Sequence, residues 1–340
     1  MPNPMLEYSH TIGIVAMEGR GFEYPTDTVP ARNGRMYVPN RSRDSGERGV
    51  RVTVLDLDSE YYGTFGYLGD GEGQLVSPTC AAESRKGLIY VADDFTHRIS
   101  AFDYDGGFAF RWGARGSREG ELNGPSGLAF DRHDDVYVAD THNSRIQKFT
   151  SSGDFLHAFG SLGTSNGQFR LPWGLTVARS GDIYVADWGN DRIQRFSPEG
   201  EFVAAYGTRG REDGQLRRPS GVAVDERGFM YVSDWGNERV QVLDGDGNPV
   251  QVLRGEATLS RWASDFMATN REEAQARATA NLSPDLPAVY GGDPHTESAH
   301  VESLFWAPVS IKLDNAGRVY VTEANRHRIQ IYERASTRSP

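Results

Sequence analysis

The sequence of 340 residues has a single cysteine and only three lysines among its 36 basic residues. One cysteine, Cys80, excludes an internal disulfide framework and any paired-cysteine metal or redox motif. Against 47 acidic residues, the formal net charge is −11, whereas proteins that bind a phosphate backbone present a basic surface. The composition therefore argues against nucleic acid as a partner.

Long hydrophobic runs are absent as well. No segment approaches the roughly eighteen uninterrupted apolar residues of a membrane span, and the first ten residues, MPNPMLEYSH, lack the basic flank and apolar run of a secretory signal. Hydrophobic residues nevertheless make up 38% of the chain and aromatic residues 11%, which is enough for a sizeable core. We therefore expect a cytoplasmic protein that makes no membrane contact.

Glycine is plentiful, with 39 residues scattered among short apolar runs, and this pattern prompts a search for repeats. The pair Tyr-Val recurs at intervals of 53, 47, 47, 47 and 89 residues, beginning at Tyr37, Tyr90, Tyr137, Tyr184, Tyr231 and Tyr320. Within the copy at 219–252, four β-rich runs alternate with Gly, Asp and Asn turns, which predicts a four-stranded antiparallel sheet. Six such repeats predict an all-β fold, a six-bladed β-propeller with four-stranded antiparallel blades.

The longest interval exceeds the repeat by 42 residues, which we assign to an insert at 256–302 between the fifth and sixth blades. Residues 262–282 are rich in Ala, Glu, Arg and Gln and predict a helix. Residues 283–300 contain three prolines and predict a loop. A helix-plus-loop insert would suit a lid over one face, and it would equally suit a neutral loop expansion.

The two ends of the chain are predicted to close the ring. The sequence stops soon after 328–332, the third strand of the sixth repeat, so this blade lacks a fourth strand. A spare β-like run at 11–16 could supply it and leave no unpaired strand in the end blade. We therefore predict one propeller domain over 8–335, whose N-terminal strand closes the last blade.

The repeated string Tyr-Val-Ala-Asp-x-x-Asn-x-Arg-Ile-Gln resembles that of the NHL-repeat family. It appears at Tyr137–Gln147 and Tyr184–Gln194, with a close variant at Tyr231–Gln241. The second repeat has Thr96 in place of the Asn, the sixth has Glu323 and Arg326, and the first keeps only Tyr37-Val38. The resemblance implies a six-bladed propeller of the soluble bacterial type, but a propeller fold does not by itself define a function.

An acidic residue precedes an arginine by five positions in five of the repeats. The pairs are Asp93 with Arg98, Asp140 with Arg145, Asp187 with Arg192, Asp234 with Arg239, and Glu323 with Arg328. A carboxylate and a guanidinium on either side of one turn can form a charge-assisted pair. Because the pair recurs from blade to blade, we interpret it as structural rather than catalytic.

Function is expected where the blades differ. The loop before each innermost strand and the loop between its second and third strands emerge on one face, from which the insert also starts. The candidate ligand-binding residues on that face are Phe95, His142, Trp173, Trp188, Trp235 and Asn325. Such apolar groups around a channel mouth are typical of a binding site, although Trp188 and Trp235 could equally pack loop on loop.

Two kinds of enzyme are alternatives to a binding module. Amidating lyases similar to this family hold zinc through histidines from several blades, but the inner strands here start with Thr26, Thr79, Ser126, Trp173, Ser220 and Val309. We therefore predict no metal and no cofactor; a channel metal would need His142, His295 and His300 to meet through an inward-folded insert. A calcium-type hydrolase is suggested only by the segment DGDGN at 244–248, which lacks the required glutamate because Gly255 stands there.

The sequence thus favours a binding or scaffold propeller that engages a protein partner or a small ligand at the face carrying the insert. The alternative is an enzyme, a lyase or a hydrolase and possibly metal-dependent, with its site at the mouth of the central channel. No GxSxG, phosphate-binding loop or HExxH motif supports the enzyme. We accordingly expect binding rather than catalysis.

Overall fold

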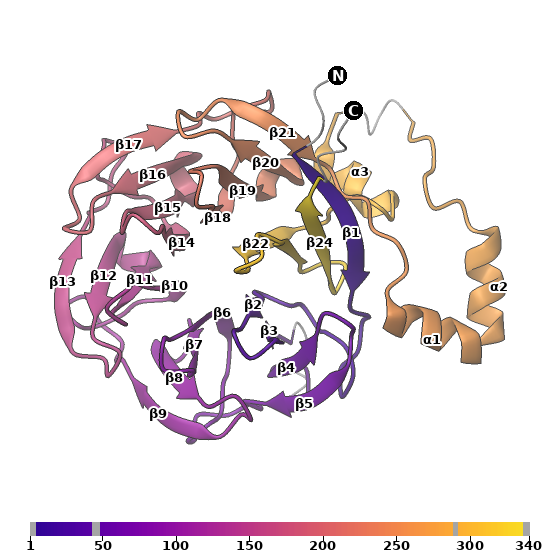
Figure 1. Ribbon diagram of the computed structural model, residues 1–340, viewed down its shortest axis with the longest axis horizontal. Coiled ribbons are helices and arrows are strands. Elements are labelled where there is room, and N and C mark those ends of the chain that lie inside the picture. The colour runs from indigo at the N-terminus through magenta and orange to yellow at the C-terminus, as the bar shows by residue number, and fades with distance from the viewer. Residues whose placement is uncertain (1–4, 43–47, 288–291, 336–340) are drawn as a thin grey trace.

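The computed structural model describes residues 5–42, 48–287 and 292–335. Its strands form six four-stranded sheets arranged in a ring (Figure 1). Neighbouring strands within each sheet are antiparallel, so the predicted six-bladed fold is confirmed. No helix in these described segments is long and apolar enough to cross a membrane.

The blades follow one another along the chain, and each runs from its innermost to its outermost strand. Blade one contains β2 (Val29–Pro30), β3 (Arg35–Asn40), β4 (Arg51–Asp56) and β5 (Tyr61–Phe65). Blade two contains β6 (Pro78–Glu83), β7 (Ile89–Asp93), β8 (Arg98–Phe102) and β9 (Phe108–Trp112). Blade three contains β10 (Pro125–Phe130), β11 (Val136–Asp140), β12 (Arg145–Phe149) and β13 (Phe155–Phe159).

The later blades repeat this arrangement. Blade four contains β14 (Pro172–Val177), β15 (Ile183–Asp187), β16 (Arg192–Phe196) and β17 (Phe202–Tyr206). Blade five contains β18 (Pro219–Val224), β19 (Met230–Asp234), β20 (Arg239–Leu243) and β21 (Pro249–Leu253). Blade six contains β22 (Pro308–Leu313), β23 (Val319–Glu323) and β24 (Arg328–Arg334), with β1 (Leu6–Ile12) as its outer strand. Short 3-10 turns η1 (Thr141–Asn143), η2 (Trp188–Asn190) and η3 (Trp235–Asn237) join the second and third strands of blades three to five.

The core lies between the faces of neighbouring blades. One buried cluster joins Tyr90 and Ile99 of blade two to Leu128 and Phe149 of blade three. The tyrosine of every Tyr-Val pair is almost fully buried. Because each blade buries its apolar faces against two neighbours, the repeated sequence stabilises a closed ring rather than separate sheets.

The strand that completes blade six is β1, which pairs antiparallel with β24. It spans Leu6–Ile12 and overlaps the run expected at 11–16 only at its C-terminal end. The strand ends because Gly13 adopts a φ of 113°, a conformation that favours glycine. The chain then turns into a loop in which Val15 bridges to Phe22. Leu6 and Ile12 are both buried, which fixes the register of the strand.

The insert differs from the sequence prediction in two respects. The single helix expected at 262–282 is two helices, α1 (Arg261–Thr269) and α2 (Arg271–Thr279), separated at Asn270, where φ is −117° and ψ is 85°. The loop expected at 283–300 ends in a third helix, α3 (Pro294–His300), capped by Asp293. Pro294 was read as a loop residue, but proline is favoured in the first turn of a helix, where no N–H bond is lost.

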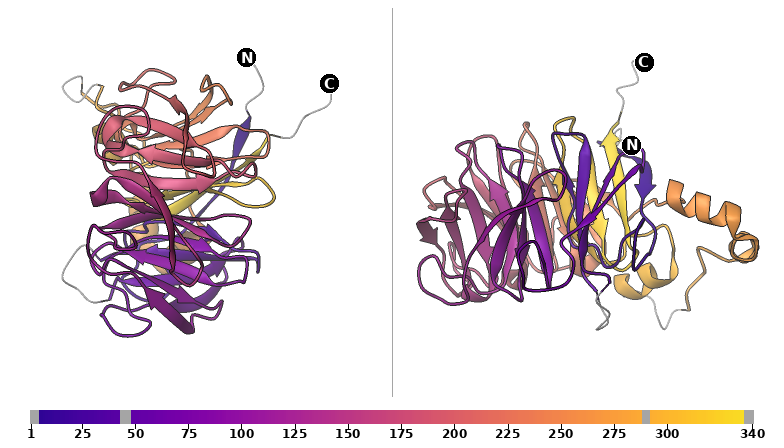
Figure 2. Two further views of the ribbon diagram at one scale, coloured as in Figure 1. Left: turned by 90° about the vertical axis from the view of Figure 1, so that its left-hand side faces the viewer. Right: turned by 90° about the horizontal axis from the view of Figure 1, so that it is seen from below.

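The first two helices of the insert lie outside the ring. Figures 1 and 2 show α1 and α2 projecting sideways from the rim beside β1, away from the channel. Trp262 fixes α1 there: its side chain is 1% exposed and packs against Phe22 and Tyr61. Of the two alternatives for the insert, a lid over the mouth is therefore not formed by these two helices. The third helix, α3, contacts η3, the turn between the second and third strands of blade five.

Candidate functional site

One face of the ring gathers the loops that vary between blades. In blades two to six the inner strand begins at a proline, which pairs with the last residue of the second strand. The loop before the inner strand and the turn after the second strand therefore meet at the same end of the sheet. We refer to this end, where the residues after the prolines face the channel, as the mouth.

The repeated carboxylates tie these two loops together. Asp140 accepts hydrogen bonds from Arg145 Nε at 2.8 Å and from the backbone N–H of Asn123 at 2.6 Å. The same pairing occurs in blades four, five and six, between Asp187 and Arg192, Asp234 and Arg239, and Glu323 and Arg328. These carboxylates are fully buried, and burial raises the pKa of Asp187 and of Asp234. Since every oxygen is engaged, the role of these four pairs is structural.

Blade two departs from this rule and corrects the prediction there. Arg98 pairs with Asp70, not with Asp93. Asp93 instead accepts four backbone N–H bonds, from Val76, Ser77, Phe95 and Thr96. The motif is incomplete in this blade because Thr96 and Ser100 stand where blades three to five have Asn and Gln, so two side-chain amide donors to the carboxylate are missing.

Three of the predicted site residues line one cavity at the mouth. Trp173, at the start of β14, and the turn residues Trp188 and Trp235 form much of the wall of a cavity of about 270 Å³. Its remaining lining residues are Tyr24, Thr26, Arg41, Thr79, Ser220, Val309 and Ala324. Blades four and five thus supply three indole rings to a single concave surface. We refer to it as the tryptophan cavity.

The polar groups around this cavity are largely engaged within the protein. Thr79 donates its hydroxyl to the Pro125 carbonyl at 2.7 Å, and Ser220 donates to the Pro308 carbonyl at 2.8 Å. Arg41 pairs with Asp94 at 2.7 Å. The surface left for a ligand is therefore dominated by indole rings and aliphatic groups.

The other three predicted residues do not reach the tryptophan cavity. Phe95 is 70% exposed in the turn of blade two. His142 lies in η1, with its ring against the backbone of Gly124, and Asn325 lies in the turn of blade six. Conversely, Tyr24 and Arg41 line the cavity and were not predicted, because the degenerate motif of blade one hides their equivalence to loop residues of the other blades.

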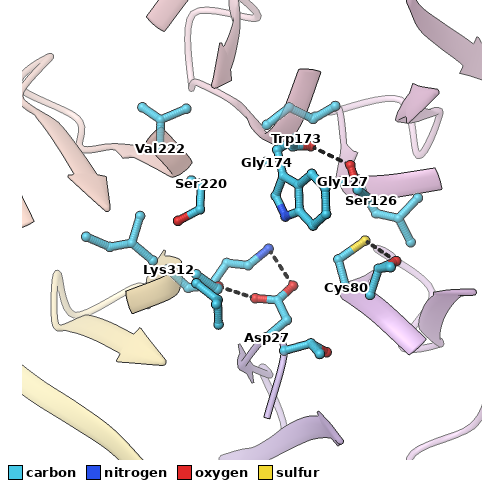
Figure 3. A pocket seen from close by; sticks show the side chains of 17 residues that line it. Asp27, Cys80, Ser126, Gly127, Trp173, Gly174, Ser220, Val222 and Lys312 are labelled. Carbon is cyan, nitrogen blue, oxygen red and sulfur yellow. Dashed lines mark hydrogen bonds and ion pairs between the residues drawn. The ribbon is translucent and has the colours of Figure 1, made fainter. Parts of the chain in front are cut away.

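A narrow channel shares five lining residues with the tryptophan cavity, and Figure 3 shows the side chains around this channel. Its free volume is only about 30 Å³, room for roughly one water molecule. Asp27 lies across it: its carboxylate pairs with Lys312 Nζ at 3.2 Å and accepts hydrogen bonds from Ala81 N at 3.0 Å and from the Ser310 hydroxyl. Asp27 and Lys312 line this channel and not the tryptophan cavity.

Cys80 lines the same channel but is not arranged as a nucleophile. Its side chain is buried, and burial raises the pKa of the thiol to about 12. A thiol attacks as its thiolate, so at neutral pH Cys80 remains an inert apolar group. Its buried position suits packing.

No group of three or more His, Cys, Asp or Glu residues able to hold a metal occurs among the described residues. The site considered from His142, His295 and His300 is not assembled: His295 Nδ1 lies 2.7 Å from Glu238, and His300 Nδ1 lies 2.8 Å from the Thr296 carbonyl. In the segment 244–248, the Asp244 carboxylate accepts two hydrogen bonds from Asn248. One comes from the backbone N–H at 2.8 Å and the other from the side-chain amide of Asn248 at 3.0 Å. These hydrogen bonds to Asn248 lower the pKa of Asp244, and the segment is a hairpin turn.

Comparison with known proteins connects this architecture to a repeat family. Residues 122–149, 169–196, 216–243 and 305–332 each match the family described as NHL repeat. These matches fall on blades three to six, where the pairing of the acidic residue with the arginine is intact. No curated protein matches the chain at a significant level.

Several solved structures share the fold. A streptogramin B lyase is 12% identical, with a TM-score of 0.57, and the match covers 97% of both chains. A catalytically inactive variant of virginiamycin B lyase from Staphylococcus aureus, solved with quinupristin, is 12% identical with a TM-score of 0.57 over 97% of this chain and 100% of that chain. A protein of unknown function from Bacteroides thetaiotaomicron is 20% identical with a TM-score of 0.60, over 93% of this chain and 72% of that chain. At these identities the similarity establishes the fold alone.

Proposed function

The chain is an NHL-repeat six-bladed β-propeller, and from that premise we propose that it is a binding module whose ligand occupies the tryptophan cavity. The observation that carries the proposal is the convergence of Trp173, Trp188 and Trp235 on one hollow. A concave, mainly apolar surface with a few polar groups at its edge is the usual form of a ligand site.

Packing alone does not account for these rings. Trp188 and Trp235 lie 6.3 Å apart between ring centroids, close enough to contact, yet a cavity remains between them and Trp173. Each indole is only partly buried, so its free face stays available for an apolar group. Core aromatic residues of this chain, such as Phe149 and Tyr231, are in contrast fully covered.

The size of the cavity limits what enters it. A volume of about 270 Å³ accommodates one ring system or a branched aliphatic group. Such a group could belong to a small ligand or to one protruding side chain of a protein partner. We propose that the site acts in the cytoplasm, where an unpaired thiol such as Cys80 remains reduced.

Catalysis is the less supported reading. The lyases that share the fold are too distant to transfer an activity. Among the described residues lining the tryptophan cavity there is no histidine or carboxylate, and the single cation, Arg41, is paired with Asp94. General acid or base catalysis is carried out most often by histidine or a carboxylate, so the wall favours binding.

The test is a fluorescence titration with N-phenylnaphthylamine, a neutral aromatic probe that brightens in apolar surroundings. Replacing Trp173 by Ala should weaken binding by about tenfold, because one large apolar contact is lost. Phe95→Ala is the matched control, since it removes an exposed aromatic side chain from the same face but outside the cavity. Absence of binding, or equal effects of the two substitutions, would reject the proposal.

A further inference from the structure

A second cavity adjoins the tryptophan cavity, beneath α3. Its volume is about 230 Å³, and its lining includes Arg217, Arg218, Trp235, Glu238, Asp293 and His295. We refer to it as the arginine cavity. The two arginines stand in the loop before β18, and His295 comes from α3 of the insert.

The two cavities are linked by shared residues. Trp235 lines both of them. Arg218 lines the arginine cavity, and its Cζ lies 4.7 Å from the centroid of Trp188, a wall of the tryptophan cavity. Each cavity alone falls below the roughly 300 Å³ at which ligand pockets begin, whereas the two together reach that range. One ligand could therefore occupy both.

The acidic groups of the arginine cavity are already engaged. Glu238 is 2% exposed and is held by His295 Nδ1 at 2.7 Å and by the backbone N–H of Ala307 at 2.6 Å. Asp293 caps α3, accepting the hydroxyl of Thr296 at 2.9 Å, and lies 4.0 Å from Arg211. Neither carboxylate forms an ion pair with the two arginines that line the cavity.

The backbone of each arginine is bound by a carboxylate that lies outside the cavity lining. The N–H of Arg217 donates to Asp234 at 2.7 Å, and the N–H of Arg218 donates to Asp191 at 2.8 Å. Within the described segments, neither guanidinium is in an ion pair, whereas Arg239 beside them is paired with both Asp234 and Asp213. Two uncompensated cations beside an apolar hollow favour an anionic group there.

We propose that the two cavities form one site for a small aromatic anion, a ligand with a planar apolar body and a carboxylate or sulfonate. The body lies among the indole rings, and the acidic group lies against Arg217 and Arg218. This inference rests on the proposed function, because it requires the tryptophan cavity to bind. It adds the sign of the ligand's charge and the residues that select it.

The test compares two probes that share one aromatic body. Anilinonaphthalene sulfonate carries the negative charge, and N-phenylnaphthylamine lacks it. On the unmodified protein we expect the sulfonate to bind about tenfold more tightly, as a charge-assisted contact adds to the same apolar burial. The double variant Arg217→Gln with Arg218→Gln should remove this preference, so that the two probes bind to it with equal affinity.

Two further variants separate charge from structure. Arg217→Lys with Arg218→Lys keeps the charge and should retain part of the preference, and Arg209→Gln, at a side chain 81% exposed on the same face, should retain all of it. Thermal unfolding checks that every variant folds. Equal affinities for the two probes, or a preference that survives the double Gln variant, would overturn the charge assignment alone. Failure of both probes to bind would overturn the proposed function as well.

Discussion

His327, in the turn of the last blade, accepts a hydrogen bond at Nδ1 from the backbone N–H of Tyr24 in the first blade, at 3.0 Å. Both residues adopt a left-handed backbone, with φ of 52° and 44°. The same contact joins three other pairs of neighbouring blades, through His97 with Gly124, Asp191 with Arg218, and Glu238 with Ala307. The mouth is thus held by a repeated tie between blades, and the tie between His327 and Tyr24 closes the ring.

Removing that closing tie should reduce stability. We expect His327→Ala to lower the free energy of unfolding by about 1 kcal/mol, because the Tyr24 N–H loses its acceptor. His327→Asn should recover part of this loss, since asparagine supplies a side-chain acceptor and tolerates the left-handed conformation. Urea unfolding measures both variants. Equal losses for Ala and Asn would show that the hydrogen bond is not what the histidine contributes.

His97, the residue of blade two that is equivalent to His327, should make the stability of the protein depend on pH. Burial lowers the pKa of His97 below 6.5, so the unfolded chain takes up a proton before the native protein does. The stability contributed by neutral His97 is complete above pH 6.5 and declines as the pH falls through the native pKa. The loss of stability on acidification from about pH 7 to pH 5 should therefore be smaller in His97→Asn, measured by thermal unfolding across this range. His133→Asn, in an exposed turn, should retain the slope of the unmodified protein.

Much of the fold could be predicted from the sequence because the information is repeated. The Tyr-Val pairs and the Asp–Arg spacing occur several times, so each copy supports the others. Where a feature occurs once, prediction was weaker. The closing strand is predicted at 11–16 but lies at Leu6–Ile12 in the structure. Both segments are short β-like runs, and only the pairing with β24 distinguishes them. The break at Asn270 likewise interrupts a composition that favours one continuous helix.

In the candidate site, too, the residues at repeated positions could be predicted and the residues outside the repeats could not. The three tryptophans could be identified because they interrupt small residues at repeated positions of the mouth. The arginine cavity could not, because it depends on α3, which lies 57 residues from its partner in the chain, as the contact between Glu238 and His295 shows. The first repeat had also lost the motif that would have placed Tyr24 and Arg41. Sequence spacing thus locates residues within a blade but not across an insert.

Two arginines at the same motif position should differ sharply in their contribution to stability. Arg239 is 6% exposed and pairs with the fully buried Asp234, so Arg239→Gln leaves a buried carboxylate without its counter-charge. We expect the free energy of unfolding to fall by about 3–5 kcal/mol. Arg98→Gln breaks only the exposed pair with Asp70 and should lower it by about 0–1 kcal/mol. Similar losses in urea unfolding would mean that the repeated pairs are not buried anchors.

Trp262 should be the main anchor of helix α1 on the rim. Trp262 packs against Phe22 and Tyr61 and donates its indole N–H to the Ser59 carbonyl at 2.7 Å. Trp262→Ala should therefore lower stability by about 3–5 kcal/mol and increase amide hydrogen exchange over 261–279. Phe266→Ala, on the same helix but 40% exposed, should change stability by about 0.5 kcal/mol at most. Unchanged exchange in Trp262→Ala would show that α1 is held by other contacts.

Removal of the closing strand β1 should destabilise the ring and promote association between chains. A chain that starts at residue 14 lacks β1, so β24 becomes an unpaired edge, and such edges associate with other chains. Gln251 of blade five also loses its hydrogen bonds to the backbone N–H groups of Met5 and Leu6, at 3.0 and 2.8 Å. We expect a lower unfolding temperature and, by size-exclusion chromatography with light scattering, a larger mass than that of the full chain.

Two controls isolate the strand. A chain that starts at residue 5 keeps all of β1 and should behave like the full chain. A synthetic peptide of residues 5–13, added to the shortened chain, should restore the unfolding temperature and the original mass, because it offers β24 the same antiparallel partner. If the shortened chain keeps both properties without the peptide, the ring is closed by the contacts of its inner strands and the mouth ties, and β1 only covers an edge that tolerates exposure.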